Sequence, residues 1–501
     1  MEPCALGIDV GTGGTRALIA DSSGRVVASA TEEHVPFASP RTGWAEQNPD
    51  DWWRAAQLAV RNALRCGDMQ GEQIACVGLS GQMHGAVLLD AAGKVVRPAL
   101  IWCDVRTQKQ CDALNQRIGA KRLIQLTCNP ALPNFTLTKL LWVRENEPQN
   151  WSRVRSVMLP KDYVRVRMTG EKATDVADAS GTLMLDVARR RWSSEVLRAA
   201  EIDSALLPAL FESCDICGKV SRESAELTGL APGTPVVAGA GDQAAGAIGM
   251  GIVAPGAASA TIGTSGVVFA ATDHPALDPK GRLHTFCHAI PGRWHVMGVT
   301  QAAGLSLRWF RDQFGNTGVP DGRDPYEHLM DEAAKAPPGS EGLLWAPYLM
   351  GERTPHLDAQ ARGVLAGIAA SHSRSHIVRA ILEGVAFSLK DSLGIFEEMG
   401  VPVRTIRLGG GGARSRLWSQ IQADVYGHEV EITQTEEGAA YGAAILAGVA
   451  AGMWTSVDAA CKEAVRVAHC LLPISANVSV MQSQYAAYSR IYPAMKSIFR
   501  C

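Results

Sequence analysis

Two aspartates follow short apolar segments at positions that suit phosphoryl chemistry. Asp9 comes directly before the turn Gly11-Thr12-Gly13-Gly14, and Asp242 follows the small-residue segment 236–241 and precedes a Gly/Ala-rich stretch. A carboxylate beside bound phosphates can hold Mg²⁺ directly or through water. A carboxylate at a strand end can also accept a proton from a substrate hydroxyl. Either aspartate could instead be an ordinary helix N-cap or turn residue, and the residue types alone leave that alternative open.

Three glycine-rich turns could cradle the phosphates of a nucleotide. The segment 10–14 (Val-Gly-Thr-Gly-Gly) resembles 262–266 (Ile-Gly-Thr-Ser-Gly), and four glycines fill 409–412. Such turns expose backbone N–H groups that bind anions, and glycine lets a ligand approach the backbone. The P-loop, complete GxGxxG and protein-kinase signatures are absent, and two near matches to a serine-hydrolase elbow (78–82 and 263–267) have a misplaced glycine. The turns therefore favour a nucleotide over a serine hydrolase.

Two polar inserts between apolar segments could contact a polyol. The turn Gln82-Met83-His84 is flanked by Gly81 and Gly85, and a hairpin with an incidental histidine is the alternative. The segment 102–106 contains Trp102, Asp104 and Arg106. Its aspartate and arginine could orient a polyol or pair with each other, and the ion pair is slightly favoured.

Strands and helices alternate around these residues, which predicts an α/β fold. Segments 5–10, 15–20 and 25–30 are predicted strands joined by turns, and a helix is expected to begin at Pro49, with Asn48 as its N-cap. The two similar glycine turns lie about half of the 501-residue chain apart. This spacing predicts two similar lobes, each opening on a β-hairpin, with a boundary near 243–256; two unrelated turns are the alternative.

Together these segments resemble the FGGY family of carbohydrate kinases, in family order from residue 7 to about residue 448. The matching segments are 7–12, 81–85, 159–163, 239–242, 263–266, 351–355 and 409–413. The resemblance implies two RNase H-like lobes of the actin and hexokinase (ASKHA) type with a central cleft. It also implies that residues 1–245 form an N-terminal, sugar-binding lobe and residues 246–501 a C-terminal, nucleotide-binding lobe.

The resemblance further implies ATP-dependent phosphorylation of D-xylulose on O5, which gives D-xylulose 5-phosphate. In this mechanism Asp242 is the general base, Asp9 is the second catalytic residue, and both are candidate ligands of Mg²⁺. The expected substrate-binding residues are Gln82, Met83, His84, Trp102, Asp104, Asp242 and Gln243. The expected nucleotide-binding residues are Gly11, Thr12, Gly13, Gly263, Thr264, Ser265, Gly410, Gly411 and Ala413.

Two features bear on which sugar is expected. Family members that phosphorylate glycerol carry an Arg-Glu pair where this chain has Met83 and His84, which argues against glycerol. Many relatives have Asn where this chain has Gln243, so the amide reaches one methylene further. A kinase for L-ribulose, L-xylulose or gluconate is one alternative. A non-catalytic, actin-like nucleotide sensor is a more distant one.

Composition excludes several other classes. The chain has 48 Lys and Arg against 50 Asp and Glu, a net charge of −2, so it lacks the basic excess typical of nucleic-acid binding. No secretory signal or membrane span is expected, and twelve scattered cysteines suit the reducing cytoplasm. Small-molecule partners are therefore expected, and a homodimer is an assembly that the resemblance allows.

Tyr485, Tyr488 and Tyr492 have helical spacing, and packing of a terminal helix is favoured over a subunit contact.

Overall fold

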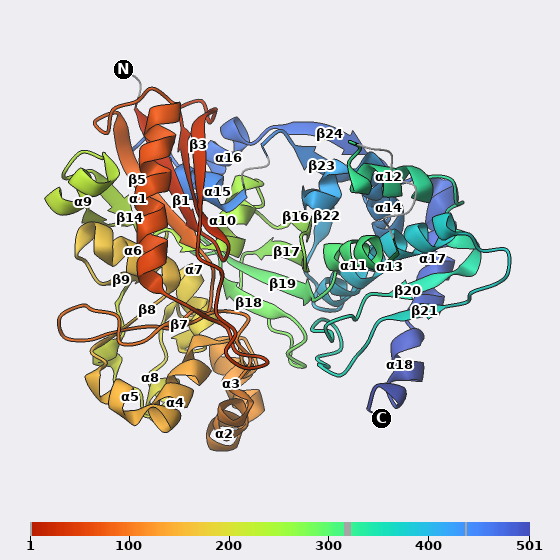
Figure 1. Ribbon diagram of the computed structural model, residues 1–501, viewed down its shortest axis with the longest axis horizontal. Coiled ribbons are helices and arrows are strands. Elements are labelled where there is room, and N and C mark those ends of the chain that lie inside the picture. Colours follow the sequence, from red (N-terminus) through yellow and green to blue (C-terminus); the bar gives the residue numbers. More distant parts are fainter. Residues whose placement is uncertain (1–2, 315–321, 436–437, 501) are drawn as a thin grey trace.

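The computed structural model describes residues 3–314, 322–435 and 438–500, and its strands form two large mixed sheets (Figure 1). Each sheet has seven strands and is covered by helices, so the predicted α/β class is confirmed. The sheets organise two lobes, as expected for the actin and hexokinase type of architecture (Figure 1). The division of the chain at residues 245 and 246 stays a prediction.

The first sheet begins with the three antiparallel strands that the sequence predicts. Its strand order is β13-β14-β5-β1-β2-β3, with β15 paired to β5. Strand β1 is antiparallel to β2 and parallel to β5. The strands are β1 (Cys4–Val10), β2 (Gly14–Ala20), β3 (Val26–Glu33), β5 (Ile74–Gly81), β13 (Ile216–Lys219), β14 (Pro235–Val237) and β15 (Ala240–Gly241).

The second sheet repeats this arrangement. Its order is β18-β19-β17-β16-β22-β23-β24, with β16 antiparallel to β17 and parallel to β22. The hairpin β16–β17 therefore corresponds to β1–β2, and the predicted internal repeat is confirmed. The strands are β16 (Gly256–Ile262), β17 (Gly266–Thr272), β18 (His284–Cys287), β19 (Trp294–Thr300), β22 (Val403–Gly410), β23 (Val430–Thr433) and β24 (Val467–Leu471).

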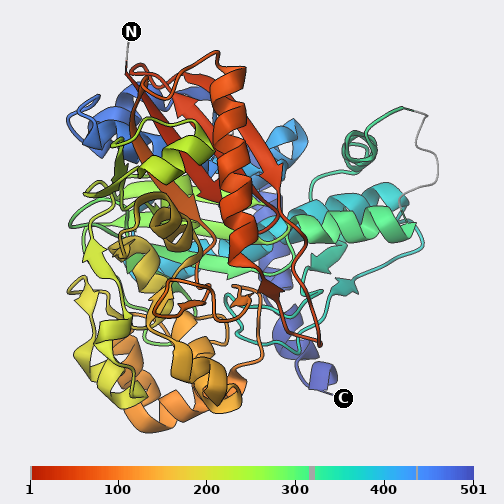
Figure 2. The ribbon, with the colours of Figure 1, turned by 60° about the vertical axis from the view of Figure 1, so that its left-hand side comes forward.

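One long helix covers a face of each sheet. Helix α1 (Pro49–Cys66) begins as predicted, because the side chain of Asn48 accepts a hydrogen bond from the backbone N–H of Asp50. It packs against β2 and β3 (Figure 2). Helix α13 (Arg374–Glu398) is its counterpart, and its apolar side chains share a core with Ala258 and Ala260 of β16.

Two small-residue helices cross where the lobes meet. Helix α10 (Asp242–Gly249) packs on α15 (Gly438–Ala450), and α15 also lies against β1 and β5 of the first sheet. A Cβ on Gly7 would lie 1.9 Å from the carbonyl oxygen of Ala440, and one on Gly78 would lie 2.0 Å from that of Ala443. Only glycine allows this backbone-to-backbone contact, so a helix from the second half of the chain joins the first lobe.

The remaining elements form smaller layers around the two sheets. Those of the first half are β4 (Glu46–Gln47), β6 (Val87–Leu89), β7 (Ala99–Leu100), α2 (Gln108–Ile118), α3 (Ala120–Thr127), α4 (Thr136–Asn146), α5 (Pro148–Arg153), β8 (Ser156–Met158), α6 (Pro160–Thr169), β9 (Ala173–Asp175), α7 (Val176–Ala179), β10 (Leu185–Asp186), β11 (Arg191–Trp192), α8 (Ser194–Ala200), β12 (Ala209–Phe211) and α9 (Arg222–Thr228). Those of the second half are α11 (Gly304–Phe314), α12 (Pro325–Ala333), β20 (Leu344–Ala346), β21 (Val364–Ala366), α14 (Arg416–Tyr426), α16 (Val457–Ala464), α17 (Ser475–Tyr488) and α18 (Ile491–Met495). No helix among the described residues is long and apolar enough to span a membrane.

The three C-terminal tyrosines pack inward, although they do not share one helix. Tyr485 and Tyr488 belong to α17, whereas Tyr492 lies in α18 after a break in the helix. The Tyr488 hydroxyl lies 3.0 Å from that of Tyr348, and the Tyr492 ring stacks on His356 with centroids 3.6 Å apart. The favoured packing role is therefore confirmed.

Candidate active site

Strand alternation decides which way Asp9 points. On β1, Leu6, Ile8 and Val10 join the core under α1, so Gly7 and Asp9 face the opposite side, where α15 packs. Asp9 pairs in register with Ser80 of β5. Its Oδ1 atom is buried and has no hydrogen-bond partner among the described residues, and burial raises the pKa of the carboxyl group. An unsatisfied buried carboxylate oxygen is an available ligand for a hard cation.

Asp242 is the first residue of α10, on the side of the sheet that Asp9 faces. The predicted strand 236–241 is divided at Gly239, which has a φ of +73° and would place a Cβ 1.9 Å from the carbonyl oxygen of Leu79. Burial first, and then the charge of Asp9, raise the pKa of Asp242 to about 7. The amide Nε2 of Gln243 lies 3.4 Å from Oδ1 of Asp242. Here the longer amide of residue 243 contacts the carboxylate that precedes it.

The turn that contains Met83 and His84 closes tightly against neighbouring backbone. His84 has a φ of +66°, and its Nδ1 lies 2.6 Å from the carbonyl oxygen of Gly181. Burial lowers the pKa of His84 to about 3, so the ring is neutral. A Cβ on Gly241 would lie 2.8 Å from the Met83 side chain, which places this turn beside the residue preceding Asp242.

A second network ties the first glycine turn to the polar inserts. The Gln82 amide donates to the carbonyl oxygen of Gly11 at 3.3 Å, and the Thr12 hydroxyl contacts Gln82 Oε1 at 3.4 Å. The indole Nε1 of Trp102 donates to the Thr12 hydroxyl at 2.9 Å. The turn itself is closed by a bond from Gly11 N–H to the Gly14 carbonyl, with Gly13 between them. Four residues expected at the sugar or the nucleotide therefore share one network.

Asp104 forms the ion pair that the sequence slightly favours. Its carboxylate oxygens accept two bonds of 2.9 Å and one of 2.6 Å from the Arg106 guanidinium, and Oδ2 also accepts from the backbone of Ala45 at 2.7 Å. The side chain is fully buried. These partners occupy the carboxylate in the first lobe, which supports a structural role for Asp104 over contact with a sugar.

The other two glycine turns meet at the end of the second sheet. In the parallel pair β16–β22, Ile262 is opposite Gly410, so the turn 263–265 and the turn 411–414 lie together. A Cβ on Gly410, whose φ is +71°, would lie 2.5 Å from the Ile262 carbonyl oxygen. Gly263 N–H bonds to Ser265 O at 2.9 Å, and the carbonyl of Thr264 accepts from the first turn of α11.

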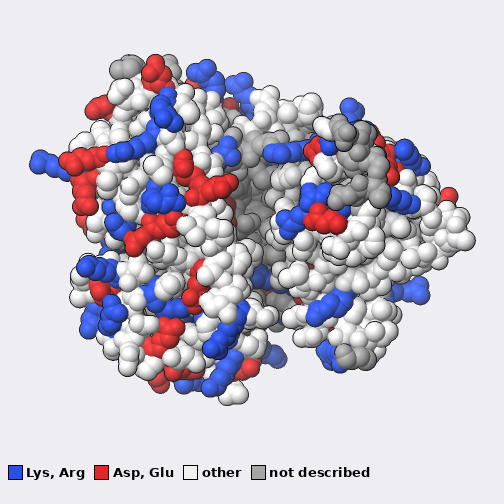
Figure 3. All heavy atoms as spheres, viewed as in Figure 1, with Lys and Arg blue, Asp and Glu red and all other residues white. Residues whose placement is uncertain are grey.

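Two adjacent cavities open along these turns. One, of about 390 Å³, lies between α10 and the second sheet and is lined in part by six predicted residues: Asp9, Asp242, Gln243, Gly410, Gly411 and Ala413. The other, of about 810 Å³, is lined in part by the predicted residues Gly263, Thr264 and Gly411. Arg414 lines both. Figure 3 shows the hollow between the two lobes on one face of the molecule.

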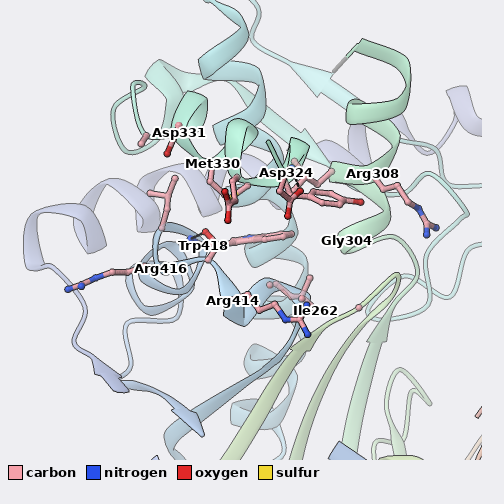
Figure 4. A pocket seen from close by; sticks show the side chains of 18 of the residues that line it. Ile262, Gly304, Arg308, Asp324, Met330, Asp331, Arg414, Arg416 and Trp418 are labelled. Carbon is pink, nitrogen blue, oxygen red and sulfur yellow. Dashed lines mark hydrogen bonds between the residues drawn. The ribbon is translucent and has the colours of Figure 1, made fainter. Parts of the chain in front are cut away.

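The larger cavity includes side chains that sequence patterns do not single out. Figure 4 shows Met330 and Asp324 above the Trp418 ring, and Arg414 and Ile262 below it. A flat aromatic side chain among apolar and polar groups suits the planar base of a nucleotide. Trp418 lies at the start of α14, directly after the glycine run, and this position could have indicated it as a nucleotide contact. The residues of α12 lie far from the glycine turns in the sequence, and only the fold brings them to this cavity.

A buried charge cluster lies behind Asp242. Lys161 contacts Asp162 and Asp175 at 2.6 Å each and Asp178 at 3.5 Å, and all four side chains are fully buried. Burial, most of all, raises the pKa of Asp178 well above its usual range, and the negative charge of Asp242 adds to the rise. The segment 159–163 carries part of the family resemblance, but its residue types predict no particular role.

Two RNase H-like lobes around a cleft, with paired carboxylates and glycine turns from both halves, define an ATP-dependent phosphotransferase of the actin and hexokinase class. The chain belongs to the FGGY family of carbohydrate kinases. Its N-terminal-domain model matches residues 4–249 and its C-terminal-domain model residues 258–451. Members of this family use ATP and a sugar as substrates.

Several known proteins are similar over nearly their whole length. Xylulose kinase of Bacillus subtilis is 39% identical over 493 residues, which cover 98% of this chain and 97% of the relative. Xylulose kinase of Escherichia coli is 42% identical over 448 residues, with 89% and 90% covered. The crystal structure of a xyloylose kinase from Brucella ovis superposes with a TM-score of 0.91 at 36% identity and covers 99% of this chain and all of that one.

Proposed function

We propose that the protein transfers the γ-phosphoryl group of ATP to O5 of D-xylulose and releases D-xylulose 5-phosphate and ADP. The observation that carries the proposal is the position of Asp242, between the Met83–His84 turn and the glycine turns. Its side chain is half-buried and has no cationic partner among the described residues. The similarity to proteins described as xylulose kinases supports the choice of sugar.

In the proposed reaction Asp242 accepts the O5 proton as that oxygen attacks the γ-phosphorus in line. A carboxyl group whose pKa is about 7 is well matched to a general base near neutral pH. Gln243 contacts this carboxylate and orients it. The N–H groups of Gly11 and Gly263 bond within their own turns, so the N–H groups of the residues that follow them, 12–13 and 264–265, stabilise the negative charge on the phosphoryl group as it moves.

The two lobes bind different ligands in this proposal. The sugar binds to the first lobe, residues 1–245, beside Gln82, Met83, His84 and Trp102. The nucleotide binds mainly to the second lobe, residues 246–501, with its phosphates at the glycine turns and its base in the larger cavity beside Trp418. A cytoplasmic location and a homodimer rest on the resemblance and on composition, and both stay predictions.

The carboxylates also fit a magnesium ion. Asp9 offers an unsatisfied oxygen, and Asp242 lines the same cavity. Among the described residues no group of three or more acidic, histidine or cysteine side chains could hold a metal. Mg²⁺ is usually bound by one or two carboxylates together with substrate phosphates and water. When bound, Mg²⁺ would neutralise phosphate charge.

Coupled ADP release tests the proposal. Purified protein with ATP and Mg²⁺ is assayed with D-xylulose, L-xylulose, D-ribulose, L-ribulose, glycerol and gluconate. A kcat/KM that is highest for D-xylulose supports the assignment. Preference for another of these compounds would contradict D-xylulose as the substrate but would leave Asp242 as the proposed base. ATP turnover that none of them stimulates would favour a nucleotide sensor.

A further inference from the structure

Arg353 is a cation to which the proposed mechanism gives no task. It lies in the segment Gly351-Glu352-Arg353-Thr354-Pro355, between β20 and β21. Its side chain is half-buried, and its guanidinium forms no hydrogen bond or ion pair with any residue in the described ranges. Desolvation lowers the pKa of Arg353. The nitrogen atoms of this half-buried side chain are not among the buried atoms that lack a partner, so they are accessible to an external ligand.

The neighbouring carboxylate does not serve as that partner. Oε2 of Glu352 accepts from the Thr300 hydroxyl at 2.6 Å, and Oε1 accepts from the backbone N–H of Gln301 at 3.0 Å and from the N–H of Arg353 itself at 2.8 Å. Burial raises the pKa of Glu352 to about 8, which favours its neutral form. Glu352 therefore fixes the backbone of the segment and leaves the guanidinium unpaired.

The next residue links the segment to the sugar turn through intervening residues. Thr354 N–H bonds to the carbonyl of Val299 at 3.0 Å, and the Thr354 hydroxyl bonds to the carbonyl of Arg282 at 2.8 Å. Arg282 precedes β18 by two residues, and β18 opens with His284. The ring of His284 meets Phe135 edge-on at 5.8 Å, and Phe135 meets His84 edge-on at 4.9 Å. A short chain of contacts thus connects the segment to His84.

The charge of Arg353 reaches the same group of residues. It contributes to lowering the pKa values of His84, Lys139 and His284. The pKa of Asp242, in contrast, depends on burial, Asp9 and Gln243. The positive charge of Arg353 therefore acts on residues of the sugar turn and not on the catalytic carboxylate. Lys139 is not free for a ligand, because its ammonium group donates to the carbonyls of His84 and Asn134 at 2.8 and 2.7 Å.

We propose that Arg353 is a sugar-specificity residue that donates hydrogen bonds to O1 and O2, at the ketone end of the bound ketose. The inference rests on the proposed function, because the reacting O5 must lie at Asp242 and the opposite end of the sugar then extends toward His84 and Arg353. A guanidinium offers five donors in a planar fork, which suits a pair of neighbouring oxygen atoms. The second lobe thereby contributes directly to choosing the sugar.

Kinetics with a truncated substrate test this contact. Arg353→Met keeps the apolar stem and removes the donors. For D-xylulose we expect kcat/KM to fall about 10- to 100-fold, mainly through KM, with KM for ATP unchanged. For 1-deoxy-D-xylulose, which lacks O1, the loss should be about fivefold smaller, because one bond is already missing. Arg362→Met is the matched control, since this exposed arginine of the following segment bonds only to the local carbonyls of Ala359 and Ala361 among the described residues.

Three outcomes would overturn the inference. An equal loss for both sugars would deny contact with O1, an increase in KM for ATP alone would place Arg353 at the phosphates, and unchanged kinetics would deny any role. If Arg353→Met unfolds, Arg353→Lys replaces it and should restore part of the D-xylulose affinity. If the wild-type protein does not phosphorylate D-xylulose, the proposed function fails separately. The same comparison then uses the sugar that is phosphorylated and its analogue truncated away from the reacting hydroxyl.

Discussion

Asp242 and Asp9 interact because two different local rules bring them to one side of a sheet. Alternation along β1 turns Asp9 away from the core under α1, and Gly241 ends β15 so that Asp242 begins α10. The two carboxylates line one cavity. Their mutual repulsion, added to burial, is what makes Asp242 a stronger base than an ordinary aspartate.

Replacing Asp242 should remove catalysis while nucleotide binding persists. For Asp242→Ala we expect kcat to fall by roughly 10²- to 10⁴-fold, the usual contribution of a general base. The glycine turns that are expected to bind ATP come from other segments, so the Kd of ATP from calorimetry should change little. A variant within about tenfold of wild-type kcat would exclude Asp242 as the base.

The raised pKa of Asp242 can be measured without turnover. In metal-free buffer, infrared difference spectra between wild type and Asp242→Asn report protonation of this carboxyl group. We expect a midpoint near pH 7, with the protonated form below it and the carboxylate above it. In an Asp9→Asn background the repulsive charge is gone, so the midpoint should move to lower pH. A wild-type midpoint at about pH 4, the pKa of a free aspartate side chain, would contradict this account.

At the scale of elements, the contact between α10 and α15 fixes the position of α10 on the first lobe. A Cβ on Gly442 would lie 1.8 Å from the carbonyl oxygen of Ala245, and one on Gly249 would lie 2.3 Å from that of Gly438. The helices touch through their backbones, which explains why the sequence 438–450 is so rich in glycine and alanine. Larger side chains would push α10, and with it Asp242, away from α15.

Gly442→Ala should therefore destabilise the protein strongly. The methyl group meets backbone rather than a flexible side chain, so we expect a loss of roughly 3 kcal/mol in the free energy of unfolding, measured by urea denaturation. Gly394→Ala is the control, because a methyl group on this helical glycine of α13 would meet no described residue within 4 Å beyond its own turn of helix. Better helix propensity should make that variant about 0.5–1 kcal/mol more stable. Equal stability of both variants would argue against the backbone contact.

At the scale of the whole molecule, the active site is divided between two lobes. The carboxylates and the sugar turn come from the first lobe, and two of the three glycine turns come from the second. Water in an open cleft would compete with the sugar for the phosphoryl group, so efficient transfer requires the lobes to close around both ligands.

Small-angle X-ray scattering should detect this closure. We expect a smaller radius of gyration with D-xylulose and a non-hydrolysable ATP analogue together than for the protein alone, because both lobes then contact ligand. Asp242→Ala should still become more compact, since it loses the base but keeps the binding surfaces. Identical scattering curves with and without both ligands would contradict closure.

Local rules made much of this protein predictable from its sequence. Apolar alternation, turn glycines and the Asn48-Pro49 helix start depend on neighbours in the chain, and they correctly indicated the two hairpins, α1 and the α/β class. The repeat of a Gly-Thr turn predicted two similar lobes. The ordered segments, from Gly7 to the glycine run at 409, were specific enough to indicate the family.

Other features depend on contacts between residues far apart in the chain, and only the tertiary structure decided them. Sequence patterns allowed Asp104 two roles, and the Arg106 pair and buried surroundings favour one. Sequence patterns suggested no role for Arg353. Whether its guanidinium has a partner depends on every residue that the fold brings near it. Hydrophobic periodicity states which side of an element is buried, but not which distant backbone meets it. For that reason the place of α15 on the first sheet, and the cleft it creates, came from the fold alone.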